Sequence, residues 1–444
     1  MAAAITRKKL SSFRITILAF AGIILIGTLL LSLPVSSRNG VPSSLGDALF
    51  TAVSATCVTG LVVQDTATHW SFFGQAVILL MIQVGGLGVV MASATFALLS
   101  GRKISLKERS MMQEAFAAPR MEGMVRMATF ILRVTFAIEI VSALIMMPTL
   151  CGEYGFRGIW MAFFVSVSAF CNAGFDIMGR LDYLFPSLSA YATNPLICFT
   201  ISTLIVLGGI GFVTWNDISS NKGNFRRYSM QSKVIIAMTA LLITLPALFF
   251  FLFEYDSLPP IERVLSSIFQ SVTTRTAGFN VEDMSKMSEP GQALTIILML
   301  IGGSPGSTAG GIKTTTLAVL LANFAAVSFR KSEAHFFGRR LDDDVIKQAG
   351  AIFMMYIGLI LLGAVTICLI EGLPYLSCLF ECASAIGTVG LTLGITPQLG
   401  TASRIILMML MFLGRVGGLT LIYAATKDMR RSLSKLPHEH ITVG

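Results

Sequence analysis

The chain has 444 residues, of which 54% are apolar, 33 are basic and 24 are acidic, giving a formal net charge of +9. Charged residues make up 13% of the chain, against roughly 25% in a soluble globular domain, which excludes an ordinary soluble enzyme. The basic residues are not pooled in one domain, so the net charge does not indicate a nucleic-acid partner. Apolar runs that reach the ~20 residues needed to cross a bilayer predict a helical, multi-spanning membrane protein.

Basic residues alternate between rich and poor segments along the chain. Four polar stretches hold seven basic against 13 acidic residues. The basic-rich segments hold 23 basic residues and lie at 1–14, 100–126, 220–233, 330–347 and 427–444. Under the positive-inside rule these segments are cytoplasmic, which places both termini inside and requires an even number of crossings. We expect a multi-pass protein of the cell membrane.

The apolar runs supply two crossings between each pair of cytoplasmic segments, which makes eight. The first run lacks a small-residue cleavage site and is therefore expected to be a span and not a cleaved signal peptide. The predicted spans are 15–33, 71–99, 124–148, 194–218, 234–253, 290–328, 348–370 and 402–426.

Each polar stretch outside the membrane contains a short semi-apolar segment that ends at a glycine. Such segments are too short to cross the bilayer and too apolar to be solvated loops, so we expect them to enter the membrane and return. Four copies predict an all-α polytopic membrane protein built from four units of span, re-entrant segment and span (M1-P-M2) around one central pore. The predicted units are 1–99, 100–219, 220–330 and 331–427, followed by a cytoplasmic tail at 428–444.

The glycines are suited to a tight turn at membrane depth, because glycine reaches positive φ without steric cost. For one loop a helix-capping glycine is the simpler interpretation, but its repetition in every unit favours a pore. Rings of backbone carbonyls can replace the water shell of a cation, and the C-terminal ends of the short helices would favour positive charge. The predicted filter consists of Val58, Thr59, Gly60, Asn172, Ala173, Gly174, Thr276, Ala277, Gly278, Thr388, Val389 and Gly390.

The segments SATCVTGL, NAGFD, TRTAGFN and GTVGLT at these glycines resemble the membrane subunits of the Trk/Ktr/HKT superfamily of potassium transporters, and most closely the bacterial Ktr-type subunit. The resemblance covers nearly the whole chain. It implies K⁺ as the transported ion, because glycine in all four loops goes with potassium, whereas serine in the first loop goes with sodium in the plant branch. It also implies a homodimer and a ring of cytosolic, nucleotide-binding (RCK-type) regulatory subunits.

The sixth predicted span, 290–328, is far longer than a bilayer requires and contains GGSPGSTAGGIKTTT. A continuous helix is improbable through Pro305 and five glycines. Broken helices at the midplane line ion paths in transporters, and the resemblance implies that this stretch is an intramembrane gate. The expected gating loop consists of Gly302, Gly303, Ser304, Pro305, Gly306, Ser307, Thr308, Ala309, Gly310, Gly311 and Lys313.

Arg415, like Lys313, is a basic residue within an apolar run. A cation at that depth is costly unless it faces water or a carboxylate. It is either half of a structural ion pair or, as the resemblance implies, a pore-facing electrostatic barrier below the filter.

The sequence predicts no enzyme, no cofactor in this chain and no metal other than transported K⁺; a dependence on Na⁺ stays open. Besides the regulatory subunits, membrane lipid is the expected partner of the basic inner surface.

Two alternative functions remain. An alternating-access secondary transporter coupled to Na⁺ or H⁺ would need inverted or paired repeats, whereas these four run in one direction. An intramembrane hydrolase would need a His or Asp opposite Ser304 or Ser307 that the sequence does not show.

Overall fold

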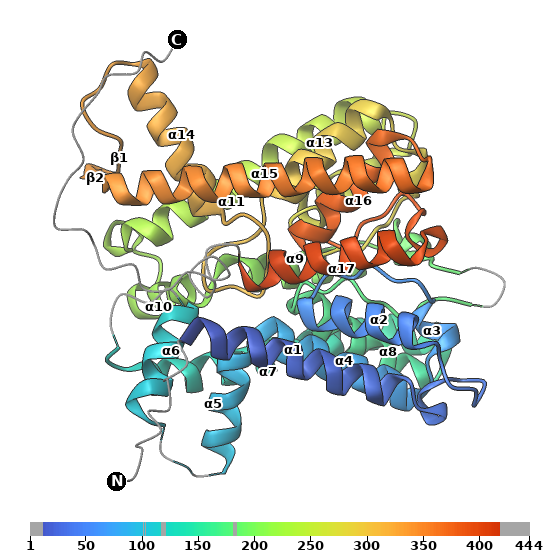
Figure 1. Ribbon diagram of the computed structural model, residues 1–444. Helices are drawn as coiled ribbons and strands as arrows, with labels where there is room; N and C mark the ends of the chain where they lie inside the picture. Colours follow the sequence, from blue (N-terminus) through green and yellow to red (C-terminus); the bar gives the residue numbers. More distant parts are fainter. Residues whose placement is uncertain (1–11, 101, 103, 117–120, 181–183, 418–444) are drawn as a thin grey trace, which may run out of the picture.

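The computed structural model describes residues 12–417 except 101, 103, 117–120 and 181–183. A long helix, a short helix and a third helix, called medium here, follow one another four times along the chain (Figure 1); the medium helix has 16 residues except in the third unit, where α13 has 12. The long helices are α1 (Ser12–Leu31), α7 (Met124–Tyr154), α11 (Met230–Phe249) and α15 (Asp343–Glu371). The short helices are α2 (Leu45–Cys57), α8 (Arg157–Phe170), α12 (Pro260–Thr273) and α16 (Tyr375–Gly387). The medium helices are α4 (Phe72–Leu87), α9 (Pro195–Ile210), α13 (Glu289–Leu300) and α17 (Thr401–Val416).

The remaining elements connect these helices or extend them. They are the helices α3 (Thr66–His69), α5 (Val89–Leu99), α6 (Leu106–Phe116), α10 (Phe212–Asn221) and α14 (Thr314–Ser328), the π-helix η4 (Phe250–Glu254), and short 3-10 turns. Strands β1 (His335–Phe336) and β2 (Arg339–Arg340) form an antiparallel hairpin. In the described part of the chain, the regular secondary structure is therefore helical apart from this hairpin, which the sequence did not predict, and two isolated β-bridges.

In the described residues four helices are long and apolar enough to cross a membrane, or up to six if each of two bent helix pairs counts as one span. Large apolar side chains on the outer faces of the long helices are exposed, as expected of surfaces that face lipid; among them are Leu25, Leu144, Leu248 and Leu362. The eight-span topology stays a prediction. The end of the last predicted span and the tail at 428–444 lie outside the described residues.

Two predicted spans are bent. The α4–α5 pair turns by 101° and the α9–α10 pair by 96°, at Gly88 with φ 85° and Gly211 with φ 95°. A helix cannot continue through a residue with positive φ, and glycine adopts it at no steric cost. The spans predicted at 71–99 and 194–218 therefore each contain a sharp bend at a glycine, and whether each bent pair makes one crossing stays a prediction.

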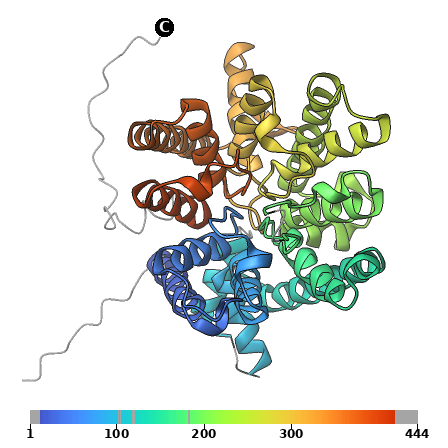
Figure 2. The same ribbon diagram turned by 90° about the vertical axis from the view of Figure 1, so that its right-hand side faces the viewer.

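The four helical units close into a ring, which is seen end-on in Figure 2. Each medium helix packs against the short helix of the next unit: α4 against α8, α9 against α12, α13 against α16, and α17 against α2. The last contact joins the fourth unit back to the first. The core of each unit includes a phenylalanine of its short helix, exposed by 1% or less: Phe50, Phe164, Phe269 and Phe380.

Candidate functional site

The loops that follow the four short helices meet at the centre of the ring. A Cβ built on Gly60 would lie only 2.5 Å from the carbonyl oxygen of Ala173, and one on Gly174 would lie 2.6 Å from that of Ala277. The contact recurs from Gly278 to the carbonyl oxygen of Val389 and from Gly390 to that of Thr59. Since each loop touches the next and the fourth touches the first, the loops surround one axis, and a Cβ at any of the four glycines would force its neighbour to move.

The residue two positions before each glycine has a left-handed backbone although it is not glycine. These residues are Val58 (φ 58°), Asn172 (φ 58°), Thr276 (φ 70°) and Thr388 (φ 50°). Positive φ is uncommon for non-glycine residues, above all for β-branched ones. Its recurrence at one position in all four units shows that the loops share a backbone conformation. In the first and fourth loops a serine holds the glycine amide, with Gly60 N 3.1 Å from Ser54 Oγ and Gly390 N 3.0 Å from Ser384 Oγ.

A cavity of about 330 Å³ lies on one side of this ring, and all four loop glycines line it. Two carboxylates also line it, Asp65 and Asp176. The Asp65 carboxylate accepts hydrogen bonds from Ala67, Thr68 and Phe185. That of Asp176 accepts one, from the Met178 amide at 3.0 Å. Asp176 lies outside the predicted spans, and its burial, with the charge of Asp65 nearby, raises its pKa to about 7. Asp176 was not among the predicted site residues.

The third unit is interrupted between α13 and α14, as the sequence predicted. The loop docks on the bend between α9 and α10, where helix ends leave backbone groups unpaired. Ser304 N donates to Gly209 O at 2.9 Å, and Thr308 N donates to Gly208 O at 3.2 Å. In return Phe212 N, the first amide of α10, donates to Gly306 O at 2.8 Å. The second and third units therefore satisfy each other's backbone groups.

Two cationic side chains, Lys313 in the loop and Arg415 beside it, donate hydrogen bonds to backbone carbonyls. Lys313 Nζ donates to Ala309 O of its own loop at 2.7 Å. The Arg415 guanidinium donates to Thr308 O, to Gly85 O, and to Gly86 O at 2.9 Å. None of the ion pairs found among the described residues includes Arg415, so the ion-pair interpretation has no partner there. The side chain instead joins three units: α17 to the loop of the third unit and to the end of α4.

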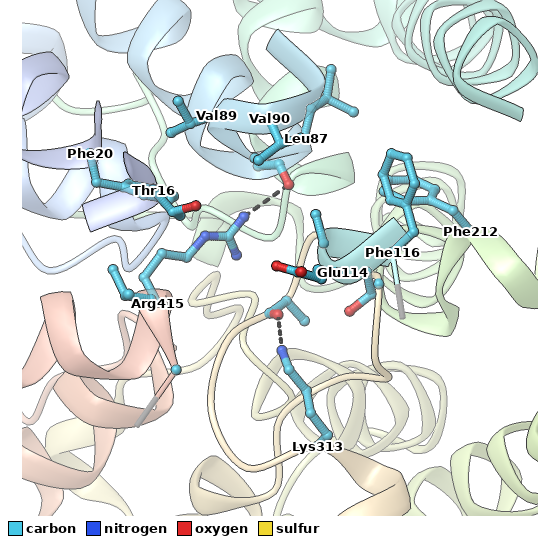
Figure 3. A pocket seen from close by; sticks show the side chains of 18 of the residues that line it. Thr16, Phe20, Leu87, Val89, Val90, Glu114, Phe116, Phe212, Lys313 and Arg415 are labelled. Atoms are coloured by element: carbon cyan, nitrogen blue, oxygen red, sulfur yellow. Dashed lines mark hydrogen bonds between the residues drawn. The ribbon is translucent and has the colours of Figure 1, made fainter. Parts of the chain in front are cut away.

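A second cavity, of about 320 Å³, lies beyond the ends of α4 and α17 (Figure 3). Arg415, Lys313 and Glu114 line it, together with the loop residues Gly306 and Ser307. Figure 3 shows the Arg415 side chain reaching across this cavity from α17. The tip of the loop also touches α6, since a Cβ on Gly306 would lie 2.5 Å from Phe116 O. Parts of the loop and Arg415 therefore line the second cavity.

The predicted site residues fall into two groups that lie next to each other. A Cβ on Gly310 of the loop would collide with the Thr388 side chain, and the Thr308 hydroxyl oxygen lies 3.3 Å from the Asn172 amide. Gly85, Gly208 and Gly414 closely approach carbonyl oxygens of the short helices. This agrees with close helix packing, which glycine pairs in membrane helices favour.

Comparison with known proteins identifies close relatives. The sequence model of the TrkH family, described as cation transport protein, matches residues 5–434. The chain is 38% identical to the potassium/sodium uptake protein NtpJ of Enterococcus hirae, over 99% of this chain and 98% of that protein. It is also 38% identical to the Ktr system potassium uptake protein B of Bacillus subtilis, over 92% of each. The fold matches the crystal structure of the potassium transporter TrkH from Vibrio parahaemolyticus with a TM-score of 0.74 and 18% identity, covering 95% of this chain and 86% of that one.

Proposed function

Because this chain belongs to the TrkH family of cation transport proteins, we propose that it is the ion-translocating subunit of a potassium uptake system. It moves K⁺ across the cell membrane through a filter lined by backbone carbonyls. The closed ring of four glycine loops carries this proposal, because four backbone segments of one conformation around one axis can offer a cation successive rings of oxygen ligands. The names of both relatives include potassium, and that of the Enterococcus protein also includes sodium. The test below therefore compares K⁺ with Na⁺.

In this proposal the four units, 1–99, 100–219, 220–330 and 331–427, each contribute two crossings and one re-entrant pore helix. The repeated order of long, short and medium helices supports it. α13 and α14 together make the sixth crossing, with the loop at mid-depth. Both termini are cytoplasmic, which puts the cavity with Asp65 and Asp176 outside and the cavity with Arg415 inside.

The filter binds K⁺ through carbonyl oxygens of the twelve residues named above. The residue two positions before each glycine has a left-handed backbone. This conformation rotates successive peptide groups and so can direct the carbonyls of neighbouring residues toward one axis. The short helices end at the ring, so their negative dipole ends stabilise a cation there. Gly60 in the first loop is consistent with K⁺ as the preferred ion.

Residues Gly302 to Lys313 form the gate. The loop lies between the ring and the inner cavity and is held by backbone hydrogen bonds to α9 and α10. Arg415 acts as a latch through its bond to Thr308 and adds positive charge below the filter. We propose that opening withdraws the loop from the bend at Gly211 and breaks the Arg415 contacts.

The protein works as a homodimer with a ring of cytosolic RCK-type regulatory subunits on its inner face. The basic inner segments and the family membership support this assembly, and the relative in Bacillus subtilis is named as a protein of a system. The contact of the loop tip with α6 offers such a subunit a route to the gate, because α6 belongs to the first inner segment.

Uptake of ⁸⁶Rb⁺ into proteoliposomes tests this function, with K⁺ or Na⁺ as competitor. Purified wild-type protein and the Arg415→Ala variant are compared with protein-free liposomes, so that a closed gate is distinguished from a missing pore. Saturable uptake that K⁺ blocks far better than Na⁺ is expected. Equal competition by both ions would remove the potassium assignment, and no uptake by either protein would contradict the pore.

A further inference from the structure

Asn172 differs from the residues at the same place in the other three loops. The others are Val58, Thr276 and Thr388, and in the described part of the chain the hydroxyls of the two threonines have no hydrogen-bond partner. Asn172 has the same left-handed backbone, with φ 58°, and is fully buried. A buried amide needs several partners, so its surroundings are informative.

The Asn172 amide joins three parts of the molecule. With its amide group oriented so that nitrogen and oxygen both have complementary partners, its nitrogen donates to Ala169 O at 3.2 Å and to Ile205 O at 3.3 Å. Its oxygen lies 3.3 Å from Thr308 Oγ1, whose one hydrogen is shared between this oxygen and Phe170 O at 3.1 Å. Ala169 belongs to the short helix α8, Ile205 to the medium helix α9, and Thr308 to the gating loop. Among the four equivalent positions this is the one with a side-chain hydrogen bond to the loop.

Thr308 also makes two backbone contacts that hold the loop in place. Its amide donates to Gly208 O, and its carbonyl oxygen accepts from Arg415. If the loop withdraws, the Asn172 oxygen loses its donor while remaining buried next to the ring. Leaving a buried acceptor unsatisfied is costly, so the second filter loop cannot have the same energy with the gating loop docked and withdrawn.

We propose that Asn172 is a positioning residue that makes the ion preference of the filter depend on the position of the gating loop. With the loop docked, Thr308 fixes the Asn172 side chain, and the left-handed backbone at 172 holds the carbonyls of Asn172 and Ala173 in the geometry that favours K⁺. With the loop withdrawn, that geometry relaxes and discrimination against Na⁺ weakens. This inference rests on the proposed function, since it requires the four loops to be a cation filter.

Titration calorimetry of K⁺ and Na⁺ into the purified full-length protein tests the inference without requiring an open gate. Asn172→Val is suitable because Val58 adopts the same φ of 58° in the first loop. Thr308→Val keeps the side-chain shape and removes the hydroxyl. We expect each single variant to lower the ratio of K⁺ to Na⁺ affinity by about tenfold, the size of one lost buried hydrogen bond, and the double variant to lower it no further.

Thr239→Val is the matched control. Thr239 is buried in α11, which is neither a filter loop nor the gating loop, and in the described part its hydroxyl has no hydrogen-bond partner; this variant should keep the wild-type ratio. If Asn172→Val does not fold, Asn172→Thr, the residue type of the third and fourth loops, replaces it in the same cycle.

Two results would overturn the inference. The first is a wild-type ratio in Asn172→Val or Thr308→Val, and the second is a double variant whose effect is the product of the two single effects. Failure of the proposed function looks different, because wild-type protein would then bind K⁺ and Na⁺ equally or bind neither.

Discussion

The guanidinium of Arg415 donates a hydrogen bond to the carbonyl oxygen of Thr308, so the last described helix holds the loop that interrupts the third unit. The same guanidinium bonds to the carbonyls of Gly85 and Gly86. These carbonyls belong to the C-terminal end of α4, where the helix dipole favours a cation. One side chain therefore fastens the loop of the third unit to the fourth and first units together.

Arg415→Ala and Arg415→Lys distinguish a latch from a simple charge barrier. Lysine keeps the charge but carries one ammonium group in place of the planar fork that reaches several carbonyls. If Arg415 is a latch, both variants raise the basal ⁸⁶Rb⁺ flux of proteoliposomes several-fold at unchanged expression. A lysine variant as tightly closed as wild type would favour the barrier.

Arg404→Ala serves as the control for those variants. Arg404 lies near the other end of α17 and pairs with Asp47 at 3.0 Å, away from the gate. Its removal should lower the melting temperature slightly and leave the basal flux at the wild-type level.

Deletion of residues 303–309 should leave a permanently leaky pore. The two ends of the loop already touch, because Gly302 N donates to Ile312 O at 2.8 Å and a Cβ on Gly302 would collide with Gly310 O. The deletion can therefore close without moving α13 or α14. Flux that stays low and regulated after the deletion would show that the loop is not the gate.

The raised pKa of Asp176 predicts that uptake depends on pH. Its pKa is raised to about 7 by burial, with Asp65 nearby, so its carboxylate is charged above that pH and neutral below it. As pH falls through 7 the outer cavity loses negative charge, and the KM for ⁸⁶Rb⁺ should rise while the maximal rate changes little. Asp176→Asn should have a raised KM that no longer varies between about pH 6 and pH 8. The exposed Asp256 is the control, and Asp256→Asn should keep the wild-type pH profile.

Gly88→Ala tests the bend between α4 and α5. A Cβ at Gly88 meets no atom within 4 Å, but φ is +85° and ψ is 146°, a conformation nearly confined to glycine, so the cost is backbone strain alone, about 1–3 kcal/mol. Gly22→Ala is the matched control, since a Cβ there also meets nothing within 4 Å and its helical backbone favours alanine. We expect a lower melting temperature for Gly88→Ala only; equal melting temperatures would contradict the strained turn.

The repeat and the interrupted third unit could be predicted because each has a strong local signal. Four glycines recurred at one place in each unit, and Pro305 with its neighbouring glycines cannot lie in a continuous helix. The bends at Gly88 and Gly211 could not be predicted, since a glycine in an apolar run serves close packing as readily as a turn. Whether Arg415 bonds to a carboxylate, water or carbonyls depends on residues more than a hundred positions away, and one sequence does not contain that information.

The most direct test of the central claim, that four loops form one potassium filter, replaces each loop glycine by serine in turn. A Cβ at any of these positions would collide with the next loop, so all four variants should lose the preference for K⁺ over Na⁺ in competition with ⁸⁶Rb⁺ uptake. Gly152→Ser in α7, where a Cβ meets nothing within 4 Å, should keep it. The variants are Gly60→Ser, Gly174→Ser, Gly278→Ser and Gly390→Ser. A wild-type preference in any one of them would contradict a filter built from all four loops.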